Sequence, residues 1–201
     1  MEMNYKMSKA KLIVITGFAG SGKTTLGRCL ARYLGYSYIE CVEPVEYKTT
    51  LGVCRDILCI NNSVVLVIPF TSQLSNYENW KTLCQECNID LSSIEVKFIC
   101  LKHDIDIEHK RIKARNANRD KYKLEHWKEY ADSAKDIEID KRYKAYIFNN
   151  TQEGFNKHEI RDLLSWLGYA YDSNKAIDKE YKCDIDNYKD NFDKSFNISD
   201  L

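Results

Sequence analysis

Short runs of aliphatic and β-branched residues alternate with amphipathic stretches over most of the chain, and this alternation strongly constrains the fold. The stretch after the first run places Leu26, Leu30 and Leu34 on one helical face. Strands that alternate with helices are typical of an α/β protein with a parallel sheet. The predicted strands are Lys11 to Thr16, Ser37 to Cys41, Val64 to Phe70, Ile94 to Leu101 and Tyr143 to Phe148.

Several residues indicate where the helices begin and end. Gly35 is expected to close the first helix, because glycine adopts the left-handed conformation easily. Pro44 suits the first turn of the second helix, which carries Leu51, Cys54 and Leu58 on one side. The spacing from Ser75 to Glu78 is that of a capping box and predicts a third helix. Further helices are predicted over Ile105 to Arg115 and around Ile160, Leu163, Leu164 and Leu167.

The charge balance and hydropathy exclude several classes of protein. The 201 residues include 30 basic and 30 acidic side chains, so no overall positive field favours nucleic acid. The longest apolar run has seven residues, whereas a membrane helix needs about 20. The N-terminal residues lack the apolar core of a signal peptide, which predicts a cytoplasmic protein with reduced cysteines. Cys84 and Cys87 have metal-like spacing, but a zinc site would need two more ligands.

The turn between the first strand and the first helix has the sequence Gly17-Phe-Ala-Gly-Ser-Gly-Lys-Thr24, which matches G-x-x-x-x-G-K-[ST] in full. Glycines let successive backbone N–H groups converge on phosphate oxygens. The lysine supplies a charge at the β- and γ-phosphates, and the threonine hydroxyl can bind Mg²⁺. The motif predicts a P-loop for ATP, with nucleotide-binding residues Gly17, Gly20, Ser21, Gly22, Lys23, Thr24 and Thr25.

A basic segment follows the fourth predicted strand. Between Lys110 and Lys123 there are seven basic residues and one acid, a local net charge of +6. Arg111, Arg115 and Arg119 are spaced four apart and share one face while the segment stays helical. A solvated basic helix or an RNA-binding stripe would have the same composition. The position of the basic segment after a P-loop favours a different interpretation. We expect a lid, at about residues 110–123, that clamps phosphates and excludes water.

On these motifs the chain from Lys11 to about Leu167 resembles the small P-loop kinases of the shikimate, gluconate and polynucleotide kinase type. More narrowly, it is similar to an AAA-type, ATP-binding family of uncharacterised bacterial proteins. The resemblance implies a three-layer P-loop NTPase fold with a five-stranded parallel sheet of order 2-3-1-4-5, flanking helices and a short lid. It also implies that Asn150 lies near the adenine. The residues that carry it, besides the P-loop, are Pro69-Phe-Thr71, Arg111-x-x-x-Arg115-x-x-x-Arg119-Asp120 and Lys123-Leu124-x-x-Trp127.

The second strand departs from the pattern of these kinases. They usually end it in an aspartate that activates the acceptor hydroxyl or holds Mg²⁺, and Val42 stands where that aspartate often falls. Glu40 or Glu43 can substitute chemically, and we assign the role to Glu40. The third strand has no Walker-B aspartate, so Thr24 is the one metal ligand predicted firmly.

The sequence thus predicts an ATP- and Mg²⁺-dependent kinase that phosphorylates a hydroxyl of a small metabolite, with Lys23, Glu40, Arg115 and Arg119 as catalytic residues. Two alternatives remain open: an ATP-dependent switch or interaction module with weak ATPase activity, and a nucleic-acid end kinase. Nucleic acid and membrane are not expected as partners, and the oligomeric state is not predicted. Residues 1–169 are expected to form the ATP-binding domain. Residues 170–201 form a polar tail with a net charge of −3, whose aromatic and aliphatic residues recur at helical spacing.

Overall fold

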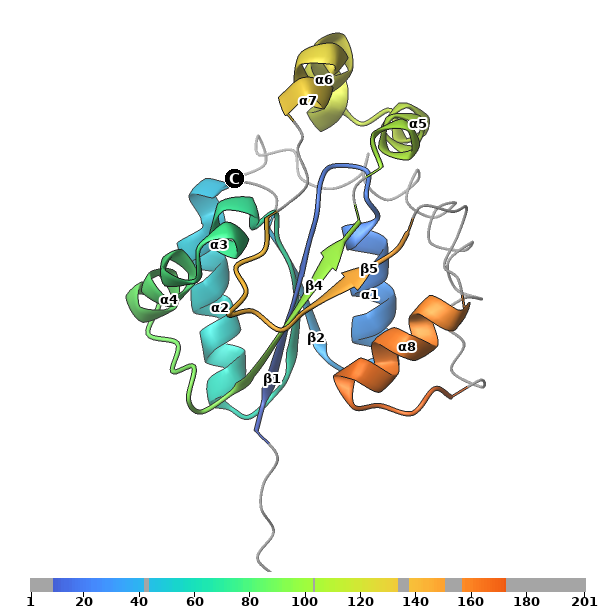
Figure 1. Cartoon of the computed structure of the whole chain (residues 1–201). Coiled ribbons are helices and arrows are strands. Elements are labelled where there is room, and N and C mark those ends of the chain that lie inside the picture. Colours follow the sequence, from blue (N-terminus) through green and yellow to red (C-terminus); the bar gives the residue numbers. More distant parts are fainter. Residues whose placement is uncertain (1–8, 42–43, 103, 134–137, 151–156, 173–201) are drawn as a thin grey trace, which may run out of the picture.

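The computed structural model describes residues 9–41, 44–102, 104–133, 138–150 and 157–172 (Figure 1). Five parallel strands form one sheet in the order β2-β3-β1-β4-β5, which confirms the expected topology. The strands are β1 (Lys11–Thr16), β2 (Ser37–Glu40), β3 (Val64–Val67), β4 (Glu95–Leu101) and β5 (Ala145–Phe148). Within the described residues, no helix has the length and apolar character needed to cross a membrane.

Helices cover both faces of the sheet, and a third group stands beyond the carboxyl ends of the strands (Figure 1). One face carries α1 (Lys23–Leu34) and α8 (Lys157–Leu167). The other carries the 3-10 helix η1 (Pro44–Glu46), α2 (Tyr47–Cys59), α3 (Thr71–Ser75) and α4 (Tyr77–Glu86). The third group, which we call the cap, consists of α5 (Ile105–Arg115), η2 (Asn118–Asp120), α6 (Lys121–Glu125) and α7 (Trp127–Ser133).

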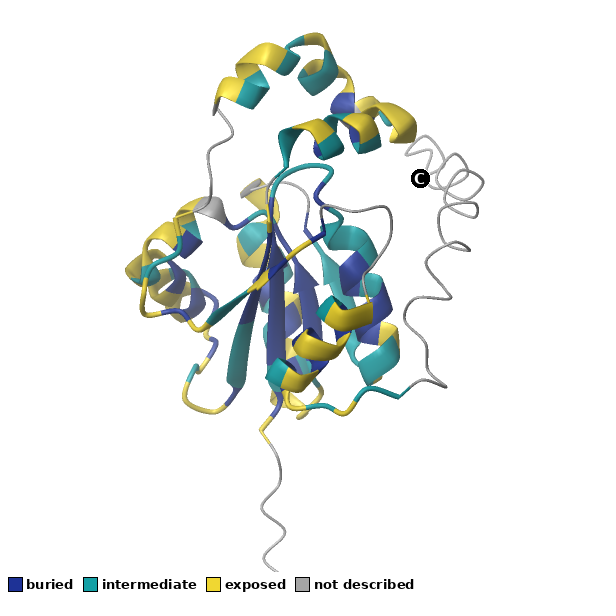
Figure 2. Cartoon of the chain, turned by 45° about the vertical axis from the view of Figure 1, so that its right-hand side comes forward, coloured by how far each residue is buried: buried dark blue, intermediate teal, exposed yellow. Residues whose placement is uncertain are grey.

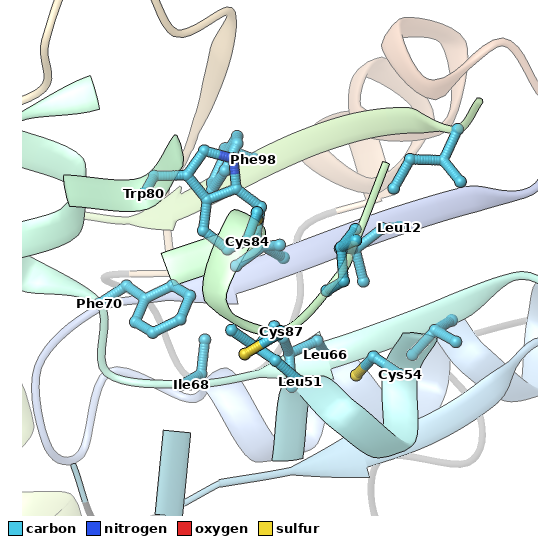
Figure 3. Packing of buried hydrophobic residues seen from close by; sticks show 14 of the residues in the cluster. Leu12, Leu51, Cys54, Leu66, Ile68, Phe70, Trp80, Cys84, Cys87 and Phe98 are labelled. Carbon is cyan, nitrogen blue, oxygen red and sulfur yellow. The ribbon is translucent and has the colours of Figure 1, made fainter. Parts of the chain in front are cut away.

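The alternation of side chains along β1 divides the core into two clusters. Leu12 and Val14 enter the cluster beneath α2 and α4, and Ile13 and Ile15 enter the cluster beneath α1 and α8. All four are fully buried, as expected of a central parallel strand (Figure 2). In the first cluster the ring of Trp80 lies between Phe70 and Phe98, with centroid distances of 5.7 and 5.4 Å (Figure 3).

Several predicted boundaries differ from the structure. β2 ends one residue early at Glu40, β4 begins one residue late at Glu95, β5 begins two residues late at Ala145, and Pro44 opens the 3-10 helix η1 ahead of α2. Two larger differences have a clear physical reason. β3 ends at Val67 and not at Phe70, because Pro69 has no N–H to donate to a neighbouring strand. The helix expected to open at Ser75 is preceded by the short helix α3, and Asn76 caps α4 by accepting a hydrogen bond from the backbone N–H of Glu78. The side chain of asparagine is as good an N-cap as that of serine, so the capping-box spacing gave a boundary one residue too early.

The other helix assignments agree with the structure. The second helix buries Leu51, Cys54 and Leu58, as predicted. The helix predicted over Ile105 to Arg115 has these same bounds, and Asn116 ends it in the left-handed conformation. Because the chain turns there, Arg119 does not continue the helical face of Arg111 and Arg115. The predicted helical stripe of the tail, from residue 177 onward, lies outside the described residues.

Candidate active site

The predicted P-loop connects β1 to α1 and lies at the carboxyl edge of the sheet. Gly22 is the N-cap of α1, with a φ of 98°, so the first backbone N–H groups of the helix lie next to the loop. The N-terminus of a helix attracts anions, because its N–H groups have no partner within the helix and its dipole is positive there. This geometry suits the phosphate groups for which the motif is predicted.

The loop is packed tightly from two sides, which explains two of its glycines. At Gly20, where φ is 81°, a Cβ atom would lie 2.8 Å from the backbone oxygen of Glu108 in α5. At Gly22 a Cβ atom would collide with the side-chain amide of Asn150, which follows β5. Both positions therefore exclude a side chain for reasons of space as well as backbone conformation.

Arg111 and Asn150 fasten the loop to the cap and to the sheet. The Nη1 atom of Arg111 donates to the carbonyl oxygens of Gly20 and Ser21, at 3.4 Å each, and its Nη2 atom donates to that of Asn150 at 2.9 Å. The buried Asn150 in turn donates through Nδ2 to the carbonyl of Ser21 at 2.9 Å. Both residues, predicted to bind nucleotide, thus contact the loop itself. Contact with the adenine or the phosphates stays a prediction.

Lys23 is half-buried at the start of α1, and its Nζ atom donates to the carbonyl of Phe18 at 2.7 Å. Burial lowers the pKa of Lys23 to about 8. The negative charges of Glu108 and Glu40 act in the opposite direction, and the positive charge of Arg115 adds to the lowering. The ammonium group therefore lies in a site partly shielded from water, among charged side chains of α5 and β2. An added anion there would stabilise the charged form of the lysine.

Thr24 and Glu40 meet where the P-loop adjoins the edge of the sheet. The Oγ1 atom of Thr24 donates to Oε1 of Glu40 at 2.5 Å. The hydroxyl of Ser21 is buried, and among the described residues it has no hydrogen-bond partner. Hydroxyl and carboxylate oxygens are hard ligands of the kind Mg²⁺ prefers, and an unpaired hydroxyl in the loop is available to a phosphate oxygen. These residues fit a magnesium–nucleotide complex, with Thr24 as the residue that would hold the metal.

The predicted phosphate-clamping arginines have different surroundings. Arg115 donates through Nε and Nη2 to Oδ2 of Asp120, at 2.9 and 2.6 Å. Asp120 has no exposed surface, and a buried carboxylate needs such a partner. Arg119 lies in η2, but its side chain is outside the described part of the structure. A catalytic role for either arginine stays a prediction.

Aromatic residues hold the cap together and join it to the P-loop. The ring of Trp127 in α7 stacks on that of His109 in α5, with a centroid distance of 4.0 Å and an interplanar angle of 9°. Tyr130, also in α7, receives a backbone hydrogen bond from Ala19 of the P-loop. Trp127 therefore packs inside the cap. It is not an open platform for stacking a base.

The nucleotide contact predicted for Thr25 stays a prediction, and the candidate zinc cysteines belong to the core instead of this centre. Thr25 is half-buried in the first turn of α1, while Val42 and Glu43 lie outside the described residues. Cys84 and Cys87 are buried in the hydrophobic core. In the described ranges, no three His, Cys, Asp or Glu side chains come together as a metal site.

Sequence reasoning missed three residues near the P-loop: Tyr38, Glu108 and Asp120. Tyr38 donates to Oε2 of Glu40 at 2.7 Å. Glu108 is 1% exposed. Among the neighbouring charged groups, it has the largest stabilising effect on the ammonium form of Lys23. A buried acid leaves no local pattern in a sequence. The one available indication for Asp120 was that it is the single acid in the basic segment.

A hollow of about 470 Å³ lies at the side of α2 that faces the edge strand β2. Its wall is mostly apolar or hydroxyl-bearing and includes one carboxylate. The lining residues are Ile39, Val45, Glu46, Thr49, Thr50 and Val53.

Comparison with known proteins relates part of the sequence and most of the fold to kinases. No model of a protein family matches the chain. A stretch of 49 residues, 24% of the chain, is 45% identical to shikimate kinase of Chlorobium phaeobacteroides and spans only 26% of that protein. The chain thus matches about a quarter of the length of this relative.

Solved structures match over a larger part of the chain. A fungal RNA kinase superposes with a TM-score of 0.60 at 17% identity, covering 90% of this chain and 99% of that one. A sugar kinase from a Janibacter species superposes with a TM-score of 0.56 at 14% identity, covering 80% and 96%. The topology, the P-loop and these similarities together show that the chain has the fold of the small P-loop kinases.

Proposed function

We propose that the protein is an ATP-dependent phosphotransferase that transfers the γ-phosphate to a hydroxyl group of a small metabolite. The hydrogen bond between Thr24 and Glu40 carries this proposal. It brings the hydroxyl suited to Mg²⁺ and a carboxylate to one point beside the P-loop. Phosphoryl transfer depends on such positioning of metal and charge rather than on covalent chemistry. The shikimate kinase stretch and the kinase fold support the same reaction class.

Each group has a role in this proposal. The loop N–H groups and Lys23 bind the β- and γ-phosphates, and Thr24 holds the metal ion. Magnesium bound with ATP supplies charge that neutralises the phosphates. Glu40 orients Thr24 or accepts the proton of the acceptor hydroxyl. Arg115 and Arg119, both in the cap, stabilise the negative charge of the transferring group. The positive charge of Arg115 is near enough to Lys23 to lower the pKa of that lysine.

The hollow beside β2 is our candidate for the acceptor site. It is formed by Ile39, which projects from the face of β2 opposite to Glu40, and by η1 and α2, so an acceptor in it would reach Glu40 around the carboxyl end of the strand. Its lining contains one carboxylate and no basic side chain, which favours an uncharged alcohol over an acid.

The proposal is tested by ADP release from ATP in the presence of a panel of acceptors. The panel contains neutral polyols and sugars, sugar acids, and an oligonucleotide with a free 5′-hydroxyl. We expect one small-molecule class to stimulate ADP release at least tenfold. Lys23→Ala is expected to lose this activity, whereas the matched variant Lys102→Ala, at an exposed lysine after β4, keeps it.

Two results would contradict the proposal. ATP binding without stimulation by any acceptor would favour a nucleotide-dependent switch. Stimulation by the oligonucleotide alone would indicate a nucleic-acid end kinase.

A further inference from the structure

The carboxylate of Glu40 accepts hydrogen bonds from two side chains and forms a longer ion pair with a third. Its Oε1 atom accepts from Thr24, and its Oε2 atom accepts from the hydroxyl of Tyr38 at 2.7 Å. An Nη2 atom of Arg28, one turn after Thr24 in α1, lies 3.8 Å from the same Oε2 atom. The Glu40 side chain is 18% exposed, so these contacts replace most of its solvent.

Tyr38 is well placed to orient this carboxylate. It precedes Glu40 by two residues in β2, so both side chains project from the same face of the strand. Its ring packs against α1, where a Cβ atom on Gly27 would lie 3.1 Å from Cε2. The guanidinium of Arg28 lies 5.5 Å from the ring centroid. The position of the hydroxyl is thus fixed by packing as well as by its hydrogen bond.

The hydroxyl of Tyr38 stays a donor over the physiological pH range. Burial raises the pKa of Tyr38 far above its usual value of 10, and the charge of Glu40 raises it further. The phenol proton is directed to the Oε2 atom of Glu40, as the 2.7 Å hydrogen bond requires.

This arrangement fixes the direction in which the Thr24 hydroxyl donates its hydrogen bond. Tyr38 donates to Oε2 and Arg28 forms its ion pair with the same atom, so the carboxylate is oriented with Oε1 toward the proton of Thr24. A hydroxyl that donates its proton to a carboxylate keeps its lone pairs for another partner. Outer hydrogen-bond partners of this kind orient metal ligands and increase their basicity.

We propose that Tyr38 is a positioning residue of the magnesium–nucleotide site: through Glu40 it fixes the proton of Thr24 and leaves the lone pairs of that hydroxyl available to the metal ion. The inference rests on the proposed nucleotide site and is independent of the acceptor. A phenylalanine would fill the same space but could not hold the carboxylate.

The experiment measures binding of a fluorescent ADP analogue to the full chain while the Mg²⁺ concentration is varied, with a parallel titration in EDTA. ADP is used because it binds Mg²⁺ less tightly than ATP, so the protein's contribution to metal binding is visible. We expect Tyr38→Phe to bind the analogue in EDTA as the wild type does. We expect it to need about tenfold more Mg²⁺ for the same gain in affinity, as is usual when an outer partner of a metal ligand is lost.

Tyr33→Phe is the matched control. Tyr33 lies near the end of α1. Its hydroxyl donates to the carbonyl of Ala170 and accepts from the backbone N–H of Asp172, away from the P-loop. This variant should have the Mg²⁺ requirement of the wild type. In a Glu40→Gln background, Tyr38→Phe should add no further change, because Tyr38 acts through Glu40.

The possible failures can be told apart. A normal Mg²⁺ requirement in Tyr38→Phe, together with a raised one in Thr24→Ala, would overturn the role of Tyr38 alone. Loss of analogue binding in EDTA by Tyr38→Phe would also overturn it, because the residue would then act on the nucleotide and not on the metal. Failure of the wild type to bind the analogue under any condition would overturn the proposed function as well.

Discussion

Lys23 combines a half-buried position with a pKa lowered to about 8, and this gives nucleotide binding a specific pH dependence. A bound phosphate favours the charged form of the lysine and raises its pKa. Below pH 8 the lysine is protonated in the free and in the bound protein, so it adds no pH dependence. Above pH 8 the free protein loses a proton that the complex keeps, so affinity should fall by up to about tenfold per pH unit.

This prediction is checked by titrating a fluorescent ATP analogue between pH 7 and pH 9.5. Lys23→Arg serves as the comparison, because a guanidinium does not titrate in this range. The arginine variant should bind more weakly, since the planar guanidinium cannot occupy the same space. Its affinity should not begin to fall near pH 8. If the affinity of this variant also falls above pH 8, another group is responsible for the titration.

The sequence predicted the residues of the P-loop because the motif is contiguous and each position has a local role. It also placed Glu40 correctly at the end of a strand. It could not predict that Tyr38 and Arg28 hold this glutamate, or that Glu108 is buried beside Lys23. These contacts depend on how β2, α1 and α5 pack, and no local pattern encodes that packing.

At the scale of elements, α5 is packed directly on the P-loop, and Gly20 makes this contact possible. Gly20→Ala would put a Cβ atom against the backbone of Glu108 and a side chain into a left-handed conformation. The conformation alone costs about 1–2 kcal/mol. We expect the melting temperature to fall by roughly 4 °C or more, together with loss of nucleotide binding.

Gly52→Ala is the control for this substitution. Gly52 lies inside α2, and a Cβ atom there would meet nothing within 4 Å. Alanine should stabilise this helix by about 0.5–1 kcal/mol. Both variants can be compared by differential scanning calorimetry. A Gly20 variant as stable as the wild type would mean that α5 can move away from the loop at little cost.

The ion pair of Arg115 and Asp120 fixes the turn between α5 and η2. Arg115→Ala would leave the carboxylate of Asp120 buried without its partner, at a cost of about 3 kcal/mol. The double variant Arg115→Ala/Asp120→Asn should recover most of that stability in a urea titration. If Arg115 also stabilises the transferring phosphoryl group, activity should stay low in the double variant. Recovery of both quantities would make the arginine purely structural.

The extent of the cap was only partly predictable. The basic composition and the spacing of arginines indicated a lid at residues 110–123, and the predicted helix from Ile105 to Arg115 agrees with α5. The structure extends the helical region to Ser133. The segment after Lys123 has few apolar positions, and its helices are held by ring contacts such as that of Trp127 with His109. Hydrophobic periodicity does not detect contacts of this kind.

At the scale of the whole molecule, both core clusters share the strands of one sheet, so they should unfold together. Trp80 belongs to one cluster and Trp166 packs against the other. Two variants, each retaining one of these tryptophans with the other two replaced by phenylalanine, report on the two faces separately. We expect the fluorescence midpoint of each variant in urea to coincide with its own midpoint by circular dichroism. Separate transitions would show that the two faces are independent units.

The topology followed from the sequence with the help of the family resemblance. Alternation and β-branched runs indicate a parallel sheet, but they do not give the order of the strands. That order is what the resemblance to the small P-loop kinases implies, with the first strand at the centre of the sheet.

The strand order has a consequence for synthesis of the chain. β1 leaves the ribosome before both of its neighbours, β3 and β4, and β4 begins only at Glu95. At about 5–20 residues per second, this buried central strand waits several seconds for its second partner. During that interval its apolar side chains are open to other nascent chains and to chaperones. The yield of folded protein should therefore depend on the rate of translation between the codons of β1 and those of β4.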